Sequence, residues 1–173
     1  WCPSRGLGDV YKRQALESAL SNLKEQFPFN KINLIFGCGG DRDLKKRPLM
    51  GKIAEKYSSK IYLTDDNPRN EKPFKIRNEI KKGIKNKKIH EIPDRKKGIQ
   101  EAVKNLKTGD ILLVAGKGHE KTQDYGKKRT FFSDQKIILE SIRLKNKFLS
   151  KNLKLNICLL YTSDRCRRSW MCR

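Results

Sequence analysis

Short apolar runs alternate with segments of helical periodicity along most of this chain. Four short runs carry isoleucine, leucine or valine and predict strands, at 32–36, 61–64, 89–92 and 111–115, of which the first is expected to be buried. Apolar residues spaced three or four apart predict helices over 15–23, 47–57, 73–83, 94–106 and 134–149. Strands that alternate with helices of this length favour an α/β fold with a doubly wound, mostly parallel sheet and right-handed crossovers.

Individual residues indicate where these elements end. Pro28 ends the first helix, and Pro48 suits the first turn of the second. Asp94 is a good N-cap for the fourth helix, and Ser133 is one for the last. Residues 129–132 predict an edge strand.

The composition raises the question of a nucleic-acid partner. The 173 residues suit one ordinary domain, and 41 Lys and Arg against 19 Asp and Glu give a formal charge of +22 at pH 7. The lysines are spread along almost every segment and lack the interleaved aromatic residues that stack on bases. We therefore favour a solvated lysine-rich surface, which also suits a phosphate-bearing substrate. The competing hypothesis is a basic nucleic-acid-binding α/β module, whose affinity would fall steeply with salt.

The chain ends and the cysteines limit the domain. No run approaches the roughly 18 apolar residues that span a bilayer, and a signal peptide is not recognised, so we expect a cytoplasmic protein without membrane contact. Both ends resemble translated sequencing-adapter sequence. We therefore expect adapter-like, non-native flanks at 1–14 and 158–173, one domain at 15–150 and a tail at 151–157. Four of the five cysteines lie in those flanks at spacings that fit no metal template, so neither disulfides nor a zinc site is expected.

Three loops that follow predicted strands carry the candidate chemistry: 37–43, 65–69 and 116–120. Because the carboxyl ends of parallel strands meet at one edge of a sheet, these loops should converge there. In the first loop, the glycines either let backbone approach a phosphate or supply positive φ for a tight turn. Arg42 in this loop either clamps a carboxylate or phosphate, or pairs with a neighbouring aspartate on the surface.

The second loop, Asp65-Asp66-Asn67-Pro68-Arg69, combines two carboxylates, an amide and a guanidinium. Such a set can bind both ends of a zwitterion. Repulsion between the adjacent carboxylates also favours a cationic ligand group as a partner. The alternative is an Asx-turn with a solvated arginine.

The third loop, Gly116-Lys117-Gly118-His119-Glu120, suits a phosphate nest with Lys117 as a point charge. It lacks the Ser or Thr that follows Lys in a P-loop, which argues against ATP hydrolysis at this loop. A single histidine is more often a structural hydrogen-bonding group than a catalyst. The carboxylate of Glu120 can accept an ammonium.

Four ordered motifs resemble the C-terminal domain of the Mur ligase family, over about residues 15–150. They are FGCGGDRD at 36–43, KRPLMG at 46–51, TDDNPR at 64–69 and AGKGHE at 115–120. The resemblance is to the members that add meso-diaminopimelate, and it implies a Rossmann-like α/β domain. A folylpolyglutamate synthetase-like relative shares that fold but not the Asp-Asn-Pro-Arg loop, and it is the second enzyme alternative.

The resemblance also implies which residues bind ligands. Those carried over to the acceptor amino acid, meso-diaminopimelate, are Arg42, Asp66, Asn67, Pro68, Arg69, Gly116 and Glu120. Arg69 marks the diaminopimelate users, because this ligand differs from lysine by one carboxylate and a bidentate guanidinium is its natural partner. Lys46 and His119 are the candidates for a contact with ATP, and neither a catalytic residue nor a metal ligand is assigned to this chain.

The reaction that the resemblance implies is ATP-dependent amide ligation in peptidoglycan biosynthesis, with Mg²⁺ as a further cofactor. The carboxylate of UDP-MurNAc-L-Ala-D-Glu becomes an acyl phosphate, which the amine of meso-diaminopimelate attacks. In this family the P-loop, the magnesium ligands and a carbamylated lysine belong to a central domain, and an N-terminal domain binds most of the uridine nucleotide. We therefore expect a monomeric, acceptor-binding fragment that is inactive alone.

Overall fold

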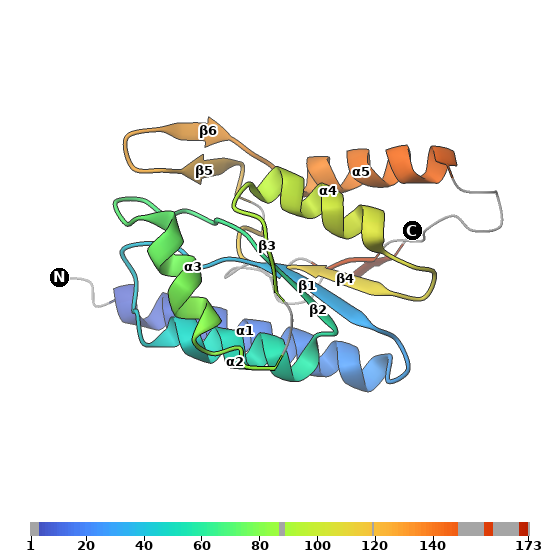
Figure 1. The fold of residues 1–173 in the computed structure, drawn as a ribbon, viewed down its shortest axis with the longest axis horizontal. Helices are drawn as coiled ribbons and strands as arrows, with labels where there is room; N and C mark the ends of the chain where they lie inside the picture. Colours follow the sequence, from blue (N-terminus) through green and yellow to red (C-terminus); the bar gives the residue numbers. More distant parts are fainter. Residues whose placement is uncertain (1–3, 87–88, 119, 149–157, 161–169, 173) are drawn as a thin grey trace.

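The main sheet is parallel, as predicted. The computed structural model describes residues 4–86, 89–118, 120–148, 158–160 and 170–172. Within these ranges the main sheet consists of β1 (Ile32–Phe36), β2 (Lys60–Leu63), β3 (Ile89–Glu91) and β4 (Ile111–Val114), in the order β3-β2-β1-β4 (Figure 1). The chain leaves β1 for β2 on one side and later returns to β4 on the other, so the strand order reverses at β1.

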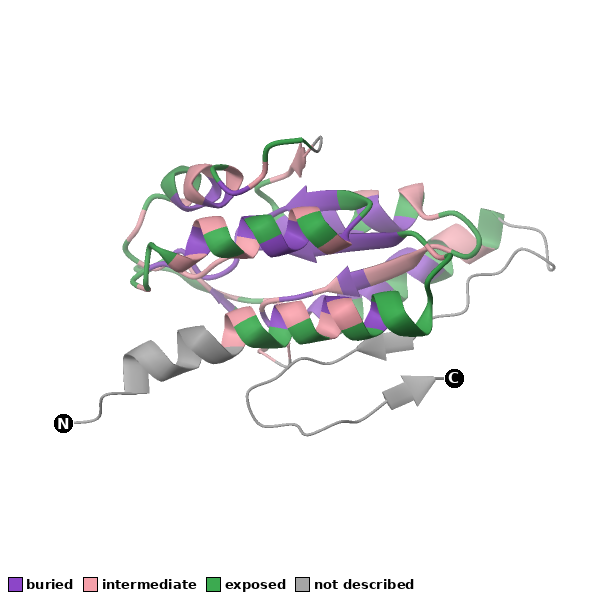
Figure 2. Ribbon diagram, turned by 90° about the horizontal axis from the view of Figure 1, so that it is seen from below, coloured by how far each residue is buried: buried purple, intermediate pink, exposed green. Residues whose placement is uncertain are grey.

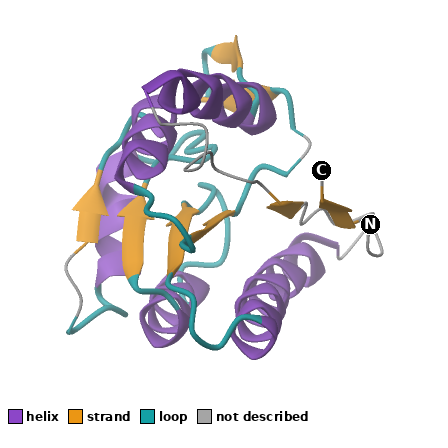
Figure 3. Cartoon of the chain, turned by 90° about the vertical axis from the view of Figure 1, so that its right-hand side faces the viewer, coloured by secondary structure: helices purple, strands orange, loops and turns teal. Residues whose placement is uncertain are grey.

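Helices cover both faces of this sheet (Figures 1 and 3). On one face lie α1 (Ser4–Gln26), α2 (Lys46–Tyr57) and α3 (Pro73–Lys81), and on the other lie α4 (Arg95–Asn105) and α5 (Asp134–Phe148). The predicted doubly wound arrangement is therefore confirmed. In the described part of the chain, none of the helices has the length and apolar character needed to cross a bilayer.

The sheet divides the core into two layers. Leu34 and Phe36 of β1 pack with Leu20 on the side of α1, whereas Ile35 packs with Ile99 on the side of α4. Successive residues of β1 thus face opposite layers, as the two-residue period of a strand requires. Because helices cover both layers, the strand appears in the sequence as a nearly continuous apolar run, with Asn33 as the exception. Figure 2 shows the buried strands between helices whose outer surfaces are exposed.

Both predicted N-caps are confirmed, whereas the first helix begins earlier than expected. Asp94 Oδ1 accepts a hydrogen bond from Lys97 N at 3.1 Å, and Ser133 Oγ accepts one from Lys136 N at 3.4 Å. Helix α1 begins at Ser4, well before the predicted start at residue 15, and so includes part of the segment that we set aside as a flank. The domain limits at 15 and 150 stay a prediction.

The predicted edge strand at 129–132 is confirmed, and it lies outside the main sheet. Strand β6 (Arg129–Phe131) pairs antiparallel with β5 (Thr122–Asp124) in a separate two-stranded sheet. A connection as short as residues 125–128 cannot cross over to a parallel neighbour, so the chain turns back on itself. Another antiparallel pair, β7 (Cys158–Leu160) with β8 (Trp170–Cys172), lies in the segment expected to be the C-terminal flank.

Candidate functional site

The three loops that we expected to converge form one hydrogen-bonded edge at the carboxyl ends of β1, β2 and β4. Gly40 N donates to Asn67 O at 2.8 Å, and Arg69 Nη1 donates to Gly40 O at 2.7 Å, which joins the first loop to the second. Asn67 Nδ2 donates to Glu120 Oε2 at 2.8 Å, which joins the second loop to the third. The second loop is therefore the middle of the site.

Close packing against the second loop explains the glycines of the first. A Cβ added to Gly37 would lie 2.2 Å from Thr64 O, and one added to Gly40 would lie 1.8 Å from Pro68 O. Neither glycine has a positive φ, so the explanation by a tight turn is wrong here. These glycines let two backbone segments touch.

Asn67 is the hydrogen-bonding centre of the site. Its Oδ1 accepts from Lys117 Nζ at 2.8 Å and from Asp124 N at 3.0 Å, while its Nδ2 donates to Glu120. The Asx-turn alternative is therefore wrong for Asn67, since its side chain binds distant segments and not its own loop. Because Oδ1 accepts from two N–H groups, reversing the amide would cost both of these bonds.

The adjacent carboxylates of Asp65 and Asp66 have different partners. Asp65 forms an ion pair with Arg77 of α3, whereas Asp66 Oδ1 lies 3.7 Å from Lys117 Nζ. Burial raises the pKa of Asp65, and the positive charge of Arg77 opposes that rise. The cation expected beside these carboxylates thus comes from the protein at Asp65. At Asp66 the buried Oδ1 accepts no hydrogen bond within the described residues.

Lys117 points into the protein, so its interpretation as the point charge of a phosphate nest is wrong. Its side chain is fully buried, and Nζ donates to Thr122 O at 2.7 Å as well as to Asn67. Glu120 Oε2 lies 3.8 Å from the same nitrogen. Burial lowers the pKa of Lys117, and the charges of Asp66 and Glu120 oppose that effect. Lys117 is therefore an internal cation of the site.

Two predicted arginines flank Gly39 in the first loop. A Cβ built on Gly39 would lie 3.0 Å from Arg69 Nη1 and 3.9 Å from Arg42 Cγ. Arg69 is half-buried and has a left-handed φ of 51°, a conformation that costs a non-glycine residue about 1 kcal/mol. Its guanidinium donates to Gly40 O and forms no ion pair within the part of the chain that the structure describes. The positive charge of the Arg69 guanidinium can therefore bind an anionic group of a ligand.

The remaining predicted residues differ in how the structure places them. Gly116 has a φ of 118°, and a Cβ there would lie 3.0 Å from Asp66 Oδ2, so this glycine belongs to the edge. Lys46 lies in the first turn of α2 with its ammonium 3.4 Å from Asp43 Oδ2. His119 lies outside the described residues. In those residues, no group of three or more His, Cys, Asp or Glu is arranged to hold a metal ion.

A buried arginine that the sequence analysis missed supports the second and third loops. The guanidinium of Arg95, in α4, donates to both carboxylate oxygens of Asp134 in α5, at 2.8 and 2.7 Å. It also donates to Thr64 Oγ1 at 3.2 Å and to Ala115 O at 2.9 Å. These two residues directly precede the second and third loops, so Arg95 ties both loops to α5.

Arg47, which is buried in α2, holds the first loop. It donates to Glu71 at 2.9 Å and 2.8 Å and to Gly39 O at 3.2 Å, and Glu71 in turn accepts from Asp41 N at 2.5 Å. The hydrogen bonds that Arg47 donates lower the pKa of Glu71. Arg47 and Arg95 both stand at core-facing positions of their helices. A charge at such a position is the sequence signal that could have found them.

Residues 12–118 match the family model described as Mur ligase, glutamate ligase domain, and the match covers more than half of the chain. The chain belongs to the Mur ligase family. The resemblance seen in the four motifs is thereby confirmed at the level of the family. The match includes the first two loops of this Mur ligase chain and ends within the third.

Relatives of this Mur ligase chain share one name, UDP-N-acetylmuramoyl-L-alanyl-D-glutamate--2,6-diaminopimelate ligase. The one from Buchnera aphidicola subsp. Baizongia pistaciae is 53% identical over 138 residues, which are 79% of this chain and 27% of the relative. The one from Wigglesworthia glossinidia brevipalpis is 52% identical over 125 residues, which are 72% of this chain and 25% of the relative. A solved structure of a ligase with this name is 38% identical, with a TM-score of 0.73, over 78% of this chain and 28% of its own. The Mur ligase chain thus spans about a quarter of the length of these curated relatives.

Proposed function

We propose that this chain is the acceptor-binding domain of a ligase that adds meso-diaminopimelate to UDP-MurNAc-L-Ala-D-Glu in peptidoglycan biosynthesis. The shared name of the relatives supports this proposal. So does the Asp-Asn-Pro-Arg sequence at 66–69, which separates this chain from folylpolyglutamate synthetase-like relatives.

The proposal rests on one arginine that lies beside carboxylate and amide side chains at the edge formed by the three loops. Arg69 forms no ion pair in the described ranges and lies next to the first loop, while Asn67 holds the Glu120 carboxylate across the site. An amino acid has an ammonium and a carboxylate. Glu120 would accept the ammonium, and Arg69 would bind a carboxylate through two parallel hydrogen bonds.

The two arginines beside Gly39 suit a ligand with more than one carboxylate. meso-Diaminopimelate has two, whereas lysine has one. With lysine in the site, Arg69 would be desolvated without an anion, at a cost of roughly several kcal/mol. We therefore infer that Arg69 selects diaminopimelate over lysine.

We further propose that ATP and Mg²⁺ are bound mainly by parts of the ligase outside this chain. Lys46 and His119 remain the candidates for a contact with ATP from this domain. ATP would turn the substrate carboxylate into an acyl phosphate, which the diaminopimelate amine would attack. On this proposal the chain works in the cytoplasm as a monomer and makes no amide product with ATP, Mg²⁺ and both substrates. A coupled phosphate-release assay that detects turnover by the chain alone would show that catalytic groups lie within it.

Isothermal calorimetry of the 173-residue chain with meso-diaminopimelate tests the proposal directly. We expect binding that Arg69→Ala weakens by about 10- to 100-fold, the range for one charged hydrogen-bonded pair. Arg129→Ala is the matched control, because the Arg129 side chain is 75% exposed and pairs with Asp124 on the hairpin. Equal affinities of Arg69→Ala and the unsubstituted chain would remove the basis of the assignment.

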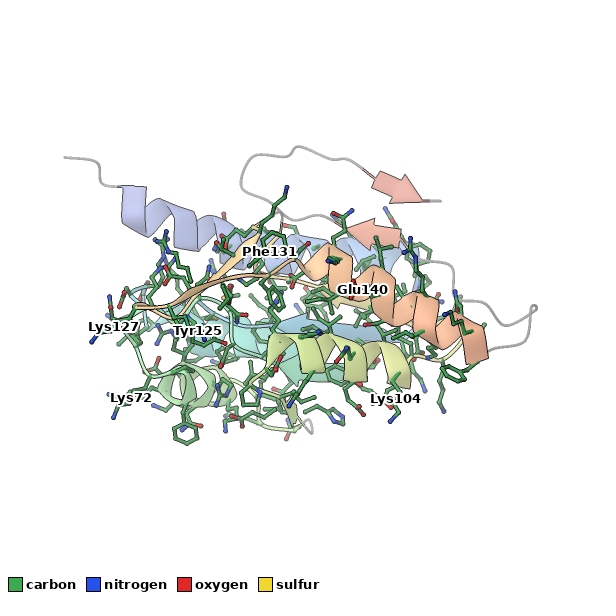
Figure 4. The ribbon with its side chains drawn as sticks, turned by 90° about the horizontal axis from the view of Figure 1, so that it is seen from above. Lys72, Lys104, Tyr125, Lys127, Phe131 and Glu140 are labelled. Carbon is green, nitrogen blue, oxygen red and sulfur yellow. The ribbon has the colours of Figure 1, made fainter. Side chains whose placement is uncertain are left out.

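The nucleic-acid alternative rests on the charge of +22. Figure 4 shows Lys72 and Lys127 at one end of the molecule and Lys104 at the other, so lysines occur at both ends. Titration with a single-stranded DNA oligonucleotide distinguishes the two functions. Affinity that falls steeply with salt and does not change in Glu120→Gln would favour the alternative.

A further inference from the structure

Four ionisable side chains from four segments surround the buried ammonium of Lys117. Asp66 Oδ1 lies 3.7 Å and Glu120 Oε2 lies 3.8 Å from Lys117 Nζ. Arg95 of α4 and Asp134 of α5, which form a buried ion pair, also act on the charge of Lys117. The other charges of this cluster come from the second loop, the third loop, α4 and α5.

The charges in this cluster do not cancel. Three carboxylates face two cations, so one negative charge is in excess when all of the groups are ionised. The excess lies toward Asp66 and Glu120, because Arg95 and Asp134 pair with each other through two hydrogen bonds. Asp66 Oδ1 accepts no hydrogen bond in the part that the structure describes. A buried negative charge of this kind is costly until a cation reaches it.

We propose that Lys117 is a positioning residue whose ammonium offsets one of the two carboxylate charges of Asp66 and Glu120 and leaves the other for the ammonium of the ligand. This role rests on the proposed function, since it assumes an amino-acid ligand at the same edge. Lys117 does not touch the ligand. It determines the net charge of the side chains that surround the ligand ammonium.

The hydrogen bonds of Lys117 support a second part of this role, the orientation of Asn67. Nζ donates to Asn67 Oδ1 and to Thr122 O, so the amide turns its Nδ2 toward Glu120. An ammonium has three N–H groups, and two of them are used in these bonds. The third is left for the carboxylates of Asp66 and Glu120.

Removing the charge of Lys117 has a specific chemical consequence. Buried Asp66 and partly exposed Glu120 would then lie without the cation that lies near both of them, and repulsion between the two carboxylates would favour protonation of one of them. An arriving ligand ammonium would replace that proton, because a cation beside a carboxylate favours its ionised form. Ligand binding would therefore release a proton in the variant and not in the unsubstituted chain.

Carboxyl NMR titration of the ligand-free chain is the first test, in Lys117→Met and in Lys117→Gln. Methionine removes both the charge and the hydrogen bonds, whereas glutamine keeps a donor and removes only the charge. In both variants the titration midpoint of Asp66 or Glu120 should rise by about one pH unit or more relative to the unsubstituted chain. Lys121→Met is the matched control, because Lys121 is exposed in the same segment, and it should leave both midpoints unchanged.

Calorimetry with meso-diaminopimelate in two buffers of different ionisation enthalpy is the second test. The unsubstituted chain and Lys117→Arg should bind with almost no proton exchange, and Lys117→Gln should release up to about one proton. A loss of packing alone would lower affinity without coupling it to protons. The proton count therefore separates a positioning role from a merely structural one.

The two tests distinguish a failure of the proposed function from a failure of the role of Lys117. If the unsubstituted chain does not bind diaminopimelate, the proposed function fails, and the titration of the ligand-free chain still decides the role of Lys117. If the midpoints of Asp66 and Glu120 in Lys117→Gln equal those in Lys121→Met, the role of Lys117 is overturned even where the chain binds diaminopimelate. If Lys117→Met does not fold, Lys117→Gln decides.

Discussion

Replacing Arg95 by methionine removes the cation that joins the second and third loops to α5. Arg95 donates four hydrogen bonds from a side chain that is not exposed at all, two of them to Asp134. Methionine fills most of the space but supplies no donor. The substitution therefore leaves the Asp134 carboxylate, which is only 8% exposed, without a positive partner, and it leaves Ala115 O and Thr64 Oγ1 without the donors that they have now.

The size of the effect follows from this burial. Breaking a buried ion pair by removing one partner costs about 3–5 kcal/mol, because the remaining charge stays desolvated. A domain of this size has about 5–15 kcal/mol of stability in total, so the loss is a large fraction of it. A surface pair lost in the same way costs about 1 kcal/mol or less.

Urea unfolding followed by circular dichroism measures this difference. Arg129→Met is the matched control, because it makes the same substitution in an ion pair with Asp124 at 3.3 Å in which the arginine side chain is 75% exposed. We expect Arg95→Met to lower the free energy of unfolding by about 3 kcal/mol or more and the control to lower it by less than about 1 kcal/mol. Equal losses in the two variants would show that the buried pair of Arg95 and Asp134 stabilises the fold no more than an exposed pair does.

Three other substitutions test the site. Gly40→Ala should lower the free energy of unfolding by about 2 kcal/mol or more in urea titrations, because the new Cβ would lie 1.8 Å from Pro68 O. Glu71→Gln should flatten the acid side of the pH–stability profile. Hydrogen bonds from Arg47 lower the folded-state pKa of Glu71, so its stabilisation is complete above the ordinary glutamate pKa of about 4.3 and is lost as the pH falls through the folded value. Arg69→Gly should be more stable than Arg69→Ala by about 1 kcal/mol in the same titrations, since glycine tolerates a φ of 51°.

Each of these outcomes has a result that contradicts it. Gly109→Ala is the control for Gly40→Ala: its φ is 84° but the nearest atom, Asn30 Nδ2, is 3.8 Å away, so its cost should stay near about 1 kcal/mol. Equal costs at the two glycines would contradict the close-packing argument. An acid profile that is the same with and without Glu71 would show that its pKa is not linked to folding. Equal stabilities of the two Arg69 variants would show that the backbone at this position is not strained.

The strand β1 was predictable because it is buried on both faces and so appears as a nearly continuous apolar run. β1 was predicted at 32–36 and is found there. Strand β5 was missed, because Thr-Gln-Asp has no apolar residue. Its place depends on contacts with the second loop: Gln123 Nε2 donates to Asp66 O at 2.9 Å, and Arg69 N donates to Asp124 O at 3.2 Å. Polar contacts of this kind do not produce a periodic pattern of apolar residues in the sequence.

The convergence of the three loops followed from topology alone, whereas the charges beneath them did not. The sequence does not say whether a lysine in a glycine-rich loop faces a ligand or the protein, and Lys117 faces the protein. Arg95 and Asp134 are far apart in the chain, and their pairing depends on how α4 packs against α5. Sequence patterns predicted the edge formed by the three loops. The buried charges of Lys117, Arg95 and Asp134 depend on three-dimensional packing, which those patterns do not contain.

The ion pair between Arg95 and Asp134 also determines the shortest segment of this domain that can be transferred to another protein. The family match ends at residue 118, before Glu120 and before all of α5. A domain trimmed to that match would keep the first two loops but leave Arg95 buried without its carboxylate. A chimera that exchanges acceptor specificity between ligases therefore has to carry the chain through Phe148, although α5 contributes no residue to the proposed contacts with the acceptor.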